Sequence, residues 1–455
     1  MAKKINETAP YNFEVTDHYK SHEYLIKEGY SRGKDVTYDT LSHFEVKKRN
    51  VFDILEIREK LLVKELLPIK YQRMSTNTFA FFRGTADVMN YDLTNGYNSG
   101  IDAIICGDAH LANFGFYSSP ERQLLFDVND FDESRVSYWE YDLKRFLVSA
   151  LLIADSQNLP KEDTEVFLKK AVEVYKEALK NIANLPSIER MLFPNTVENI
   201  VQTFGNESDE STQKLLKKAV KKAVHKNSNS AVEKFTEIDD KGKRKFIENS
   251  PVTKHISKTD YLAMVAGYEQ YVNNLSSNIK LYLSQCRVID IVRHSVGVGS
   301  VGTLCFLMLL QNNDGSYLVL QIKEALPITD GHEVYANKDQ QGLNIVNCQK
   351  ILQSASDPFL GNFKTDNKYY YVRQFRDMKG SIKLDKLDWD SFRGYVDVCI
   401  ILLARAHSQS PSFPMIIGYL ESQDWMADAF VTYSKNYRKQ VLNDYKDFLK
   451  RLEDE

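Results

Sequence analysis

Two neighbouring stretches decide the fold: Cys106-Gly-Asp-Ala-His-Leu-Ala-Asn113 and Leu125-Phe-Asp-Val-Asn-Asp-Phe-Asp132. Asp108 lies five positions before Asn113, and Asp127 follows Asn113 after fourteen positions, at the end of an apolar run. Phosphoryl transfer needs such a set, because one carboxylate orients the attacking hydroxyl and hard oxygen ligands bind Mg²⁺. Asp and Asn are also common in turns, where their side chains bond the backbone, so the same stretch fits a structural bend between two strands.

A glycine-rich stretch much later in the chain separates these interpretations: Ser295-Val-Gly-Val-Gly-Ser-Val-Gly302. Apolar runs flank it at residues 287–293 and 304–310, and Asn312-Asn-Asp-Gly315 then turns the chain into a strand that ends in Lys323. A dinucleotide-binding loop runs from a strand into a helix, whereas these glycines lie between two strands. The layout is typical of a kinase glycine-rich loop and its phosphate-binding lysine. The alternative is an ordinary hairpin with a glycine bulge and a lysine on an edge strand.

The order of the two stretches is the reverse of that in kinases, where the glycine-rich loop and the lysine come first. Residues 395–407 form an apolar stretch that is typical of a buried helix. This stretch resembles the helix that directly precedes the catalytic loop in aminoglycoside-type kinases. We therefore expect an α+β protein with a protein-kinase-like two-lobe fold, circularly permuted and carrying a helical insertion. Such permutation is tolerable where natural chain ends lie near one another at the surface.

Several longer motifs are spread over roughly residues 70 to 410. They are Phe79-Ala-Phe-Phe-Arg-Gly84, Cys106-Gly-Asp-Ala-His-Leu-Ala-Asn-Phe-Gly115, Phe126-Asp-Val-Asn-Asp-Phe-Asp-Glu133, Tyr141-Asp-Leu-Lys-Arg145, Val296-Gly-Val-Gly-Ser-Val-Gly-Thr303, Gln321-Ile-Lys-Glu-Ala325, Ser356-Asp-Pro-Phe-Leu-Gly361 and Tyr371-Val-Arg-Gln-Phe-Arg-Asp-Met-Lys-Gly380. Together they resemble the bacterial family called domain of unknown function 2252. The family name implies no activity, so the expected chemistry depends on the motifs that are similar to those of aminoglycoside and choline kinases.

The kinase resemblance implies a role for each residue of the acidic stretch. Asp108 would be the catalytic base, and Asn113 and Asp127 would bind magnesium, with Asp130 as the alternative to Asp127. Asp142, in a Tyr-Asp-Leu segment, would brace the catalytic loop from behind.

The same resemblance implies that the glycine-rich stretch binds ATP. The backbone of Gly297, Gly299, Ser300 and Gly302 would approach the phosphates, and Lys323 would contact them.

One departure from the kinase pattern concerns the partner of this lysine, which in kinases is a glutamate on a following helix. Here Glu333 follows Lys323 too closely, and Gln340, Gln341 and Gln349 would be neutral partners. An uncharged partner would leave the ammonium of Lys323 differently poised from that of the kinase lysine.

Four further residues have two interpretations each. Arg83 would either face phosphate or pair with a carboxylate. His110 is expected to have a hydrogen-bonded structural role rather than a role in proton transfer. For Arg373 and Arg376 we expect solvated surface positions rather than a functional site.

Composition excludes several classes of protein. The 455 residues include 59 basic and 62 acidic ones, and a net charge of −3 argues against a nucleic-acid or membrane-surface protein. The five cysteines are scattered without a Cys-x-x-Cys pair, which is typical of reduced thiols. The N-terminus lacks an apolar signal core, and no apolar stretch is long enough to span a bilayer. We therefore expect a cytoplasmic protein.

The sequence also predicts the domain organisation. Its parts are an N-terminal arm and helices (1–74), the catalytic and metal loops of the large lobe (75–155), a helical region with a flexible segment at 206–250 (156–285), a small sheet-rich lobe with the glycine-rich loop (286–385) and C-terminal helices of the large lobe (386–455). Individual helices are predicted over 51–67, ending near Pro68, and over 142–155, 161–183 and 341–354, and a strand over 368–374.

The predicted function is an ATP- and magnesium-dependent phosphotransferase that acts on an unidentified hydroxyl acceptor, a small molecule, a sugar or a protein. Two alternatives remain open, a nucleotide-binding pseudokinase that acts as a regulatory module and a kinase-like enzyme that transfers AMP. The sequence identifies neither the acceptor nor the oligomeric state.

Overall fold

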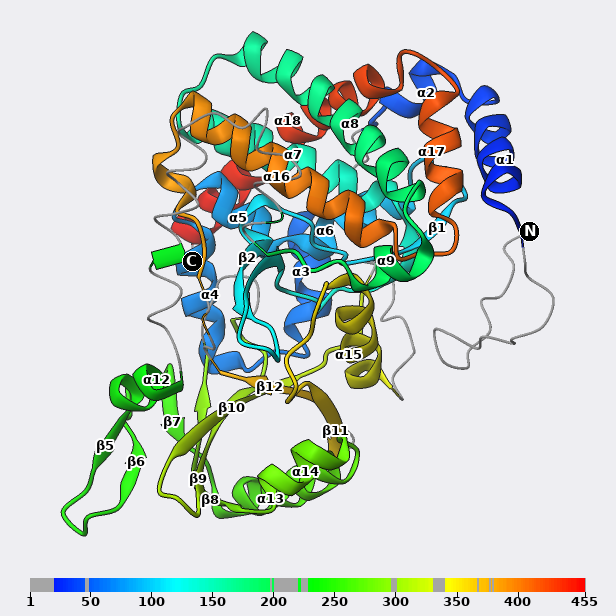
Figure 1. The fold of residues 1–455 in the computed structure, drawn as a ribbon. Coiled ribbons are helices and arrows are strands. Elements are labelled where there is room, and N and C mark those ends of the chain that lie inside the picture. Colours follow the sequence, from blue (N-terminus) through cyan, green and yellow to red (C-terminus); the bar gives the residue numbers. More distant parts are fainter. Residues whose placement is uncertain are drawn as a thin grey trace.

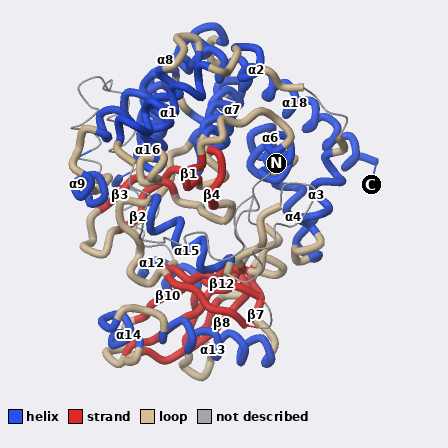
Figure 2. The backbone as a smooth tube through the Cα atoms, turned by 90° about the vertical axis from the view of Figure 1, so that its right-hand side faces the viewer, coloured by secondary structure: helices blue, strands red, loops and turns tan. Residues whose placement is uncertain are grey.

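The computed structural model describes residues 20–45, 49–196, 199, 220–221, 228–295, 301–329, 340–365, 368–375, 378 and 380–454. Most helices gather in one body, and the largest sheet lies below it, with two helices along the lower side of the sheet (Figure 1). A view turned by 90° shows the same separation of a helix-rich part from a strand-rich part (Figure 2). The architecture is a mixture of helices and largely antiparallel strands, in agreement with the expected α+β class.

The helical body is built from both ends of the chain. Its helices are α1 (His22–Lys34), α2 (Tyr38–Ser42), α3 (Val51–Glu59), α4 (Leu67–Met74), α5 (Thr78–Gly84), α6 (Ala86–Thr94), α7 (Glu140–Ser156), α8 (Lys161–Ala183), α9 (Ser187–Leu192), α15 (Gln341–Leu352), α16 (Trp389–His407), α17 (Phe413–Glu421) and α18 (Met426–Asp454). The helix α18 packs against α2, α3, α5, α7 and α8. The helix α1 packs on α17 so closely that a Cβ atom on Gly29 or Gly418 would lie 1.9 Å from a backbone oxygen of the other helix.

Two strand pairs lie within this body and carry the acidic stretch. The strands β1 (Asp102–Ile105) and β4 (Arg135–Tyr138) form one antiparallel pair, and β2 (Phe114–Ser118) and β3 (Leu124–Val128) form the other. The loop that follows β1 contains Asp108, and the loop that follows β3 contains Asp130. Both loops therefore start from strands held in the core.

The large sheet is antiparallel throughout, with the strand order β11-β12-β10-β9-β8-β7. Its strands are β7 (Thr253–His255), β8 (Cys286–His294), β9 (Cys305–Asn312), β10 (Tyr317–Glu324), β11 (Gly361–Thr365) and β12 (Lys368–Gln374). The predicted turn joins β9 to β10, where Gly315 has a φ of 86° and its N–H bonds the Asn312 carbonyl at 3.0 Å. Asparagine, aspartate and glycine suit this turn because they tolerate or favour positive φ.

Alternation along β10 divides its side chains between the two faces of the sheet. Leu318, Leu320 and Ile322 pack with the helices α13 (Lys258–Asn273) and α14 (Ser277–Leu283) on one face. On the other face, Val319 packs with α12 (Ser228–Phe235), and Lys323 reaches the acidic loop of the helical body. The lysine therefore lies on the face that the helical body covers.

Several predicted elements are confirmed, among them α8 and β12 with their predicted bounds and α7 and α15 within two residues of them at each end. The predicted end of the first helix near Pro68 is wrong, because α3 ends at Glu59 and Pro68 lies in the first turn of α4, which begins at Leu67. Proline is tolerated there because the first turn of a helix needs no N–H from it.

The predicted helical region 156–285 is interrupted by strands. β7 joins the large sheet, and β5 (Thr236–Ile238) pairs with β6 (Arg244–Phe246). Part of the segment predicted to be flexible lies outside the described residues, whereas 228–250 contains α12, β5 and β6.

Candidate functional site

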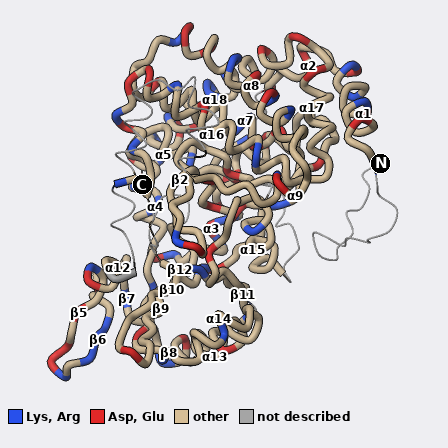
Figure 3. Tube along the Cα trace, viewed as in Figure 1, with Lys and Arg blue, Asp and Glu red and all other residues tan. Residues whose placement is uncertain are grey.

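The site lies where the sheet meets the helical body, and we call Asp108, Asn113, Asp130, Asp132 and Lys323 the junction cluster. Acidic and basic residues lie side by side near α15 and β12, at this level of the molecule (Figure 3). In this cluster Lys323 contacts Asp132, although the two residues are 191 positions apart in the sequence.

Lys323 joins the sheet to the acidic loop. Its ammonium pairs with Asp132 and lies 3.8 Å from Oδ1 of Asp130. Tyr371, directly opposite Lys323 on β12, donates its hydroxyl to Oδ1 of Asp132 at 2.8 Å. Burial alone would lower the pKa of Lys323, but the carboxylates of Asp130 and Asp132 raise it well above its usual value. The lysine is therefore charged, and its partner is an aspartate of the loop.

The sequence did not predict Asp132 as the partner of Lys323, because the kinase pattern indicates a partner on a following helix. Glu333 lies outside the described residues. The α15 side chain of Gln349 instead donates to Gln353 at 3.0 Å.

Asn113 holds the two acidic loops together through its amide. Its Nδ2 donates to the backbone oxygens of Asp108 at 3.0 Å and Asp130 at 3.1 Å, and its Oδ1 accepts from the N–H of Asp130 at 2.7 Å. The loops also meet at Gly107, where φ is 77° and an added Cβ would lie 2.1 Å from the carbonyl oxygen of Glu133. Only glycine fits that position without displacement of the neighbouring backbone.

Asp108 is oriented by an arginine that the sequence reasoning did not single out. Arg145 of α7 donates its Nε–H to Oδ1 of Asp108, and its Nη2 donates to the carbonyl of Phe82 at 2.9 Å. Only 2% of the arginine side chain is exposed, so its position is fixed by packing. Arg145 belongs to the quoted motif Tyr141-Asp-Leu-Lys-Arg145, three positions after Asp142, and that spacing was the available signal.

Asp142 of α7 contacts the backbone at the start of the loop that contains Asp108. Its carboxylate accepts the N–H groups of Cys106 at 2.8 Å and Gly107 at 2.9 Å. Nε2 of His407 lies 3.3 Å from the same carboxylate, and Nδ1 of His407 lies 2.6 Å from the hydroxyl of Tyr175. With the proton on Nε2, both contacts are hydrogen bonds, so α7, α8 and α16 jointly fix the start of the loop.

Asp127 lies apart from the junction cluster. Its side chain is fully buried, and its Oδ2 accepts from Nδ2 of Asn195 at 2.8 Å and from the N–H of Ser354 at 3.0 Å. Burial raises the pKa of this carboxyl. Asp127 therefore connects separate chain segments inside the core, whereas Asp130, the alternative, lies beside Asn113 and Lys323.

Arg83 of α5 faces the acidic loops. Burial lowers the pKa of its guanidinium, while the negative charges of Asp108 and Asp130 oppose that shift. Among the described residues, Nε of Arg83 has no hydrogen-bond partner. An anion between the loops and α5 would give this group an acceptor, so both earlier interpretations of Arg83 fit its position.

The other predicted site residues divide between described and undescribed parts of the chain. Gly297, Gly299 and Ser300 lie outside the described residues, as does Arg376. Gly302 has a φ of 100°, and its carbonyl accepts the N–H of Val63 at 2.8 Å, so the end of the glycine-rich stretch contacts the segment after α3.

Arg373 is not a solvated surface residue, contrary to expectation. Its Nε donates to Oε1 of Gln321 at 2.9 Å, and its Nη1 donates to the carbonyl of Asn129 at 3.3 Å. It lies on the Lys323 face of the sheet because β12 alternates, with Tyr371 and Arg373 on the same side.

His110 provides a pH-dependent test of this geometry. Burial lowers the pKa of its imidazole to about 4 from 6.5, despite the attraction of Asp108, whose Oδ2 lies 3.5 Å from Nε2. Between these two pH values the unfolded chain binds a proton that the folded protein does not bind. We therefore expect the free energy of unfolding to fall by about 3 kcal/mol as the pH falls from 6.5 to about 4.

The measurement is urea unfolding across this pH range for His110→Gln and for a control, His43→Gln, at an exposed position. The His110 variant should lose that part of the pH dependence, and the His43 variant should keep it. An unchanged pH dependence in His110→Gln would contradict the assignment.

The side chains of the junction cluster that could bind a metal offer carboxylate and amide oxygens, which suit magnesium better than zinc. Throughout the described ranges, no group of three or more His, Cys, Asp or Glu side chains could hold a metal ion. Magnesium needs no such group, since it usually takes one or two protein carboxylates and completes its shell with phosphates and water. Asp130 and the amide oxygen of Asn113 are donors of this kind.

The fold and the site define a mixed α+β protein with a buried lysine paired to an acidic loop. The chain belongs to the DUF2252 family, described as an uncharacterized protein conserved in bacteria, whose model matches residues 61–451. No curated protein and no solved structure matches the chain. Among the helices of the described residues, none has the length and apolar character needed to cross a membrane.

Proposed function

We propose that this protein is a magnesium- and ATP-dependent phosphotransferase with a circularly permuted, kinase-like arrangement of its parts. The observation that carries the proposal is the contact of Lys323 with Asp130 and Asp132, which joins β10, the second strand after the glycine-rich stretch, to the loop after β3. In kinases the corresponding lysine and acidic loop together hold the nucleotide phosphates.

The position of α16 supports the permuted arrangement. This helix ends at His407, beside Asp142, and shortly afterwards the hydroxyl of Ser410 accepts the N–H of Ile104 at 2.8 Å. Ile104 lies on β1, the strand that leads into the loop of Asp108. The end of a late helix thus lies next to the start of an early loop, as the resemblance to kinase order requires.

Each member of the cluster has a chemical task in this proposal. The charged ammonium of Lys323 would leave Asp132 and bind phosphate oxygens, and Asp130 and Asn113 would hold magnesium. Bound magnesium would neutralise phosphate charge. Asp108, held by Arg145, would align the acceptor hydroxyl and take its proton while the oxygen bonds to the γ-phosphorus and the bond to ADP breaks.

A second candidate is a nucleotide-binding regulatory protein without transferase activity. It is favoured by the pairing of Lys323 with Asp132 instead of a helix glutamate, because ATP must displace that carboxylate from the lysine. AMP transfer, the third candidate, would use the same residues on a nucleotide bound in the reverse direction.

The test uses the full chain with Mg²⁺ and ATP labelled at either the γ- or the α-phosphate. Magnesium-dependent release or transfer of the γ-label supports phosphotransfer, and transfer of the α-label indicates AMP transfer. Thermal stabilisation by Mg-ATP without either reaction supports the regulatory candidate.

Lys323→Met should abolish that stabilisation, whereas Lys364→Met, at an exposed position on β11, should preserve it. Absence of both stabilisation and turnover in the unaltered protein would refute the proposal.

A further inference from the structure

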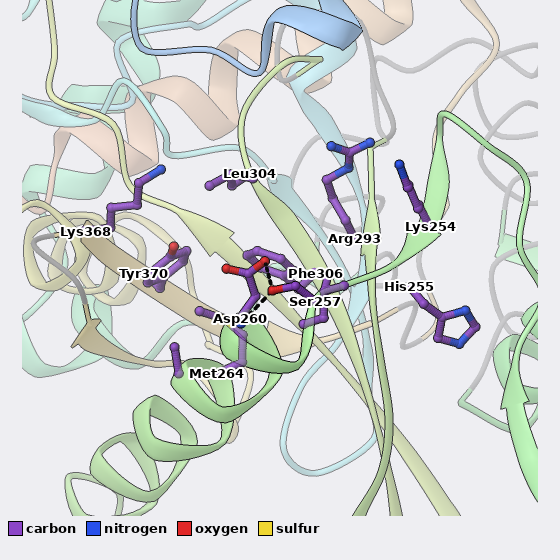
Figure 4. Close-up of a pocket in the computed structure, with 12 residues that line it drawn as sticks. Lys254, His255, Ser257, Asp260, Met264, Arg293, Leu304, Phe306, Lys368 and Tyr370 are labelled. Carbon is purple, nitrogen blue, oxygen red and sulfur yellow. Dashed lines mark hydrogen bonds between the residues drawn. The ribbon is translucent and has the colours of Figure 1, made fainter.

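A cavity of about 500 Å³ lies on the face of the sheet opposite to the junction cluster (Figure 4). Lys323 is directly opposite Cys305 on β9 and Tyr371 on β12, so these three side chains share one face. The next residues along the same strands, Phe306 and Tyr370, point to the other face and line the cavity. The cavity is therefore separate from the proposed phosphate site.

One wall of the cavity is apolar. Phe306 and Tyr370 contribute from the sheet, and Met264 contributes from α13. Leu304, at the entrance to β9, completes this surface. Figure 4 shows these side chains between the sheet and the first turns of α13. An apolar wall with a few polar groups, enclosing roughly 300–1,000 Å³, is typical of pockets for small organic ligands.

Basic side chains from three strands surround the cavity. They are Lys254 on β7, Arg293 on β8 and Lys368 on β12. In Figure 4 the charged ends of Arg293 and Lys368 lie on either side of Leu304. The first turn of α13 also faces the cavity with Ser257 and Asp260, whose side chains bond each other at 2.8 Å. Asp260 carries the one carboxylate among the described residues that line the cavity, and this hydrogen bond gives it a donor.

Two of the basic groups form ion pairs in which one partner is partly exposed to water. Arg293 pairs with Glu65 at 2.8 Å, but the glutamate side chain is 44% exposed, and Lys368, itself 43% exposed, pairs with Glu324 at 3.1 Å. Water competes for the exposed member of each pair, the Glu65 carboxylate and the Lys368 ammonium. Within the described chain, Nε of Arg293 is buried and has no hydrogen-bond partner.

We propose that this cavity binds a small organic anion with an apolar or aromatic body. The body would pack on Phe306, Tyr370 and Met264, and the anionic group would bind Arg293 with Lys254 or Lys368. Glu65 would compete with the ligand for Arg293, since both are acceptors for the same guanidinium. This inference does not depend on the proposed phosphotransferase function, because none of these residues belongs to the junction cluster.

The probe is the fluorescent anion 8-anilinonaphthalene-1-sulfonate, titrated into the full-length protein beside its uncharged analogue N-phenyl-1-naphthylamine. We expect saturable binding of the sulfonate at one site and at least about tenfold weaker binding of the neutral analogue, because charge-assisted hydrogen bonds are lost. Equal affinity for the two dyes would overturn the proposal.

Three variants locate the site. Lys254→Met should weaken sulfonate binding several-fold, and Ala263→Trp, which fills the cavity from α13, should abolish it. Glu65→Gln should instead strengthen binding several-fold, because it removes the competing carboxylate from Arg293. A matched control, Lys241→Met in the exposed turn between β5 and β6, should leave the affinity unchanged. Undiminished sulfonate binding in a folded Ala263→Trp variant would place the dye elsewhere and refute the site.

Discussion

Replacing Asp108 by asparagine should lower the rate of phosphoryl transfer by roughly a hundredfold or more, the usual contribution of a positioned general base. Asparagine keeps an oxygen that can accept from Nε of Arg145, so the side chain stays in place. It cannot accept the proton of an acceptor hydroxyl at neutral pH. The loss should therefore appear in turnover, while thermal stabilisation by Mg-ATP persists.

Asp87→Asn is the matched control for this experiment. Asp87 is a similarly buried carboxylate next to an arginine, with an exposed side-chain fraction of 11% against 13% for Asp108. It bonds the hydroxyl of Thr329 at 2.6 Å and lies outside the junction cluster. Turnover should survive in Asp87→Asn. Full turnover in Asp108→Asn would remove Asp108 from the mechanism and leave Lys323 as a nucleotide-binding residue.

Replacing Asp142 by alanine should lower the free energy of unfolding by roughly 3–5 kcal/mol, whatever the function of the protein. The carboxylate is almost completely buried and accepts two backbone N–H groups, those of Cys106 and Gly107. Alanine would leave both donors without an acceptor in a place that water does not reach, and would also remove one of the two partners of His407. Such a loss is a large fraction of the stability of a typical protein.

Urea unfolding followed by circular dichroism measures this effect. The control is Asp447→Ala, which removes an exposed carboxylate from α18 and should change the free energy of unfolding by no more than about 0.5 kcal/mol. Equal midpoints for the two variants would show that Asp142 does not hold the loop.

Local patterns predicted much of the sheet and several helices. The β9–β10 hairpin was predictable because an Asn-Asp-Gly turn lies between two apolar runs, and each of these signals acts over a few residues. The position of Lys323 near the acidic stretch was expected from the resemblance alone. The structure provides the contact itself, which no local pattern contains.

The identity of the acidic residues in the site was harder to predict. Three aspartates lie within six residues of one another, namely Asp127, Asp130 and Asp132. The sequence alone does not indicate which of their side chains is buried in the core. Asp127 is still on β3 and turns inward to Asn195 and Ser354, whereas Asp130 and Asp132 follow the strand and reach Lys323. These partners come from distant segments of the chain. Tertiary packing, and not the spacing of the motif, therefore determines which aspartate lies near Lys323.

The amide of Asn113 has a consequence for ligand binding. Because one side chain bonds the backbone at both Asp108 and Asp130, neither loop can shift without straining the other. A ligand that draws Asp130 toward itself therefore also repositions the carboxylate of Asp108, and the thermodynamic coupling must act equally in the reverse direction. Two ligands that meet at this junction would therefore change each other's affinity by the same factor.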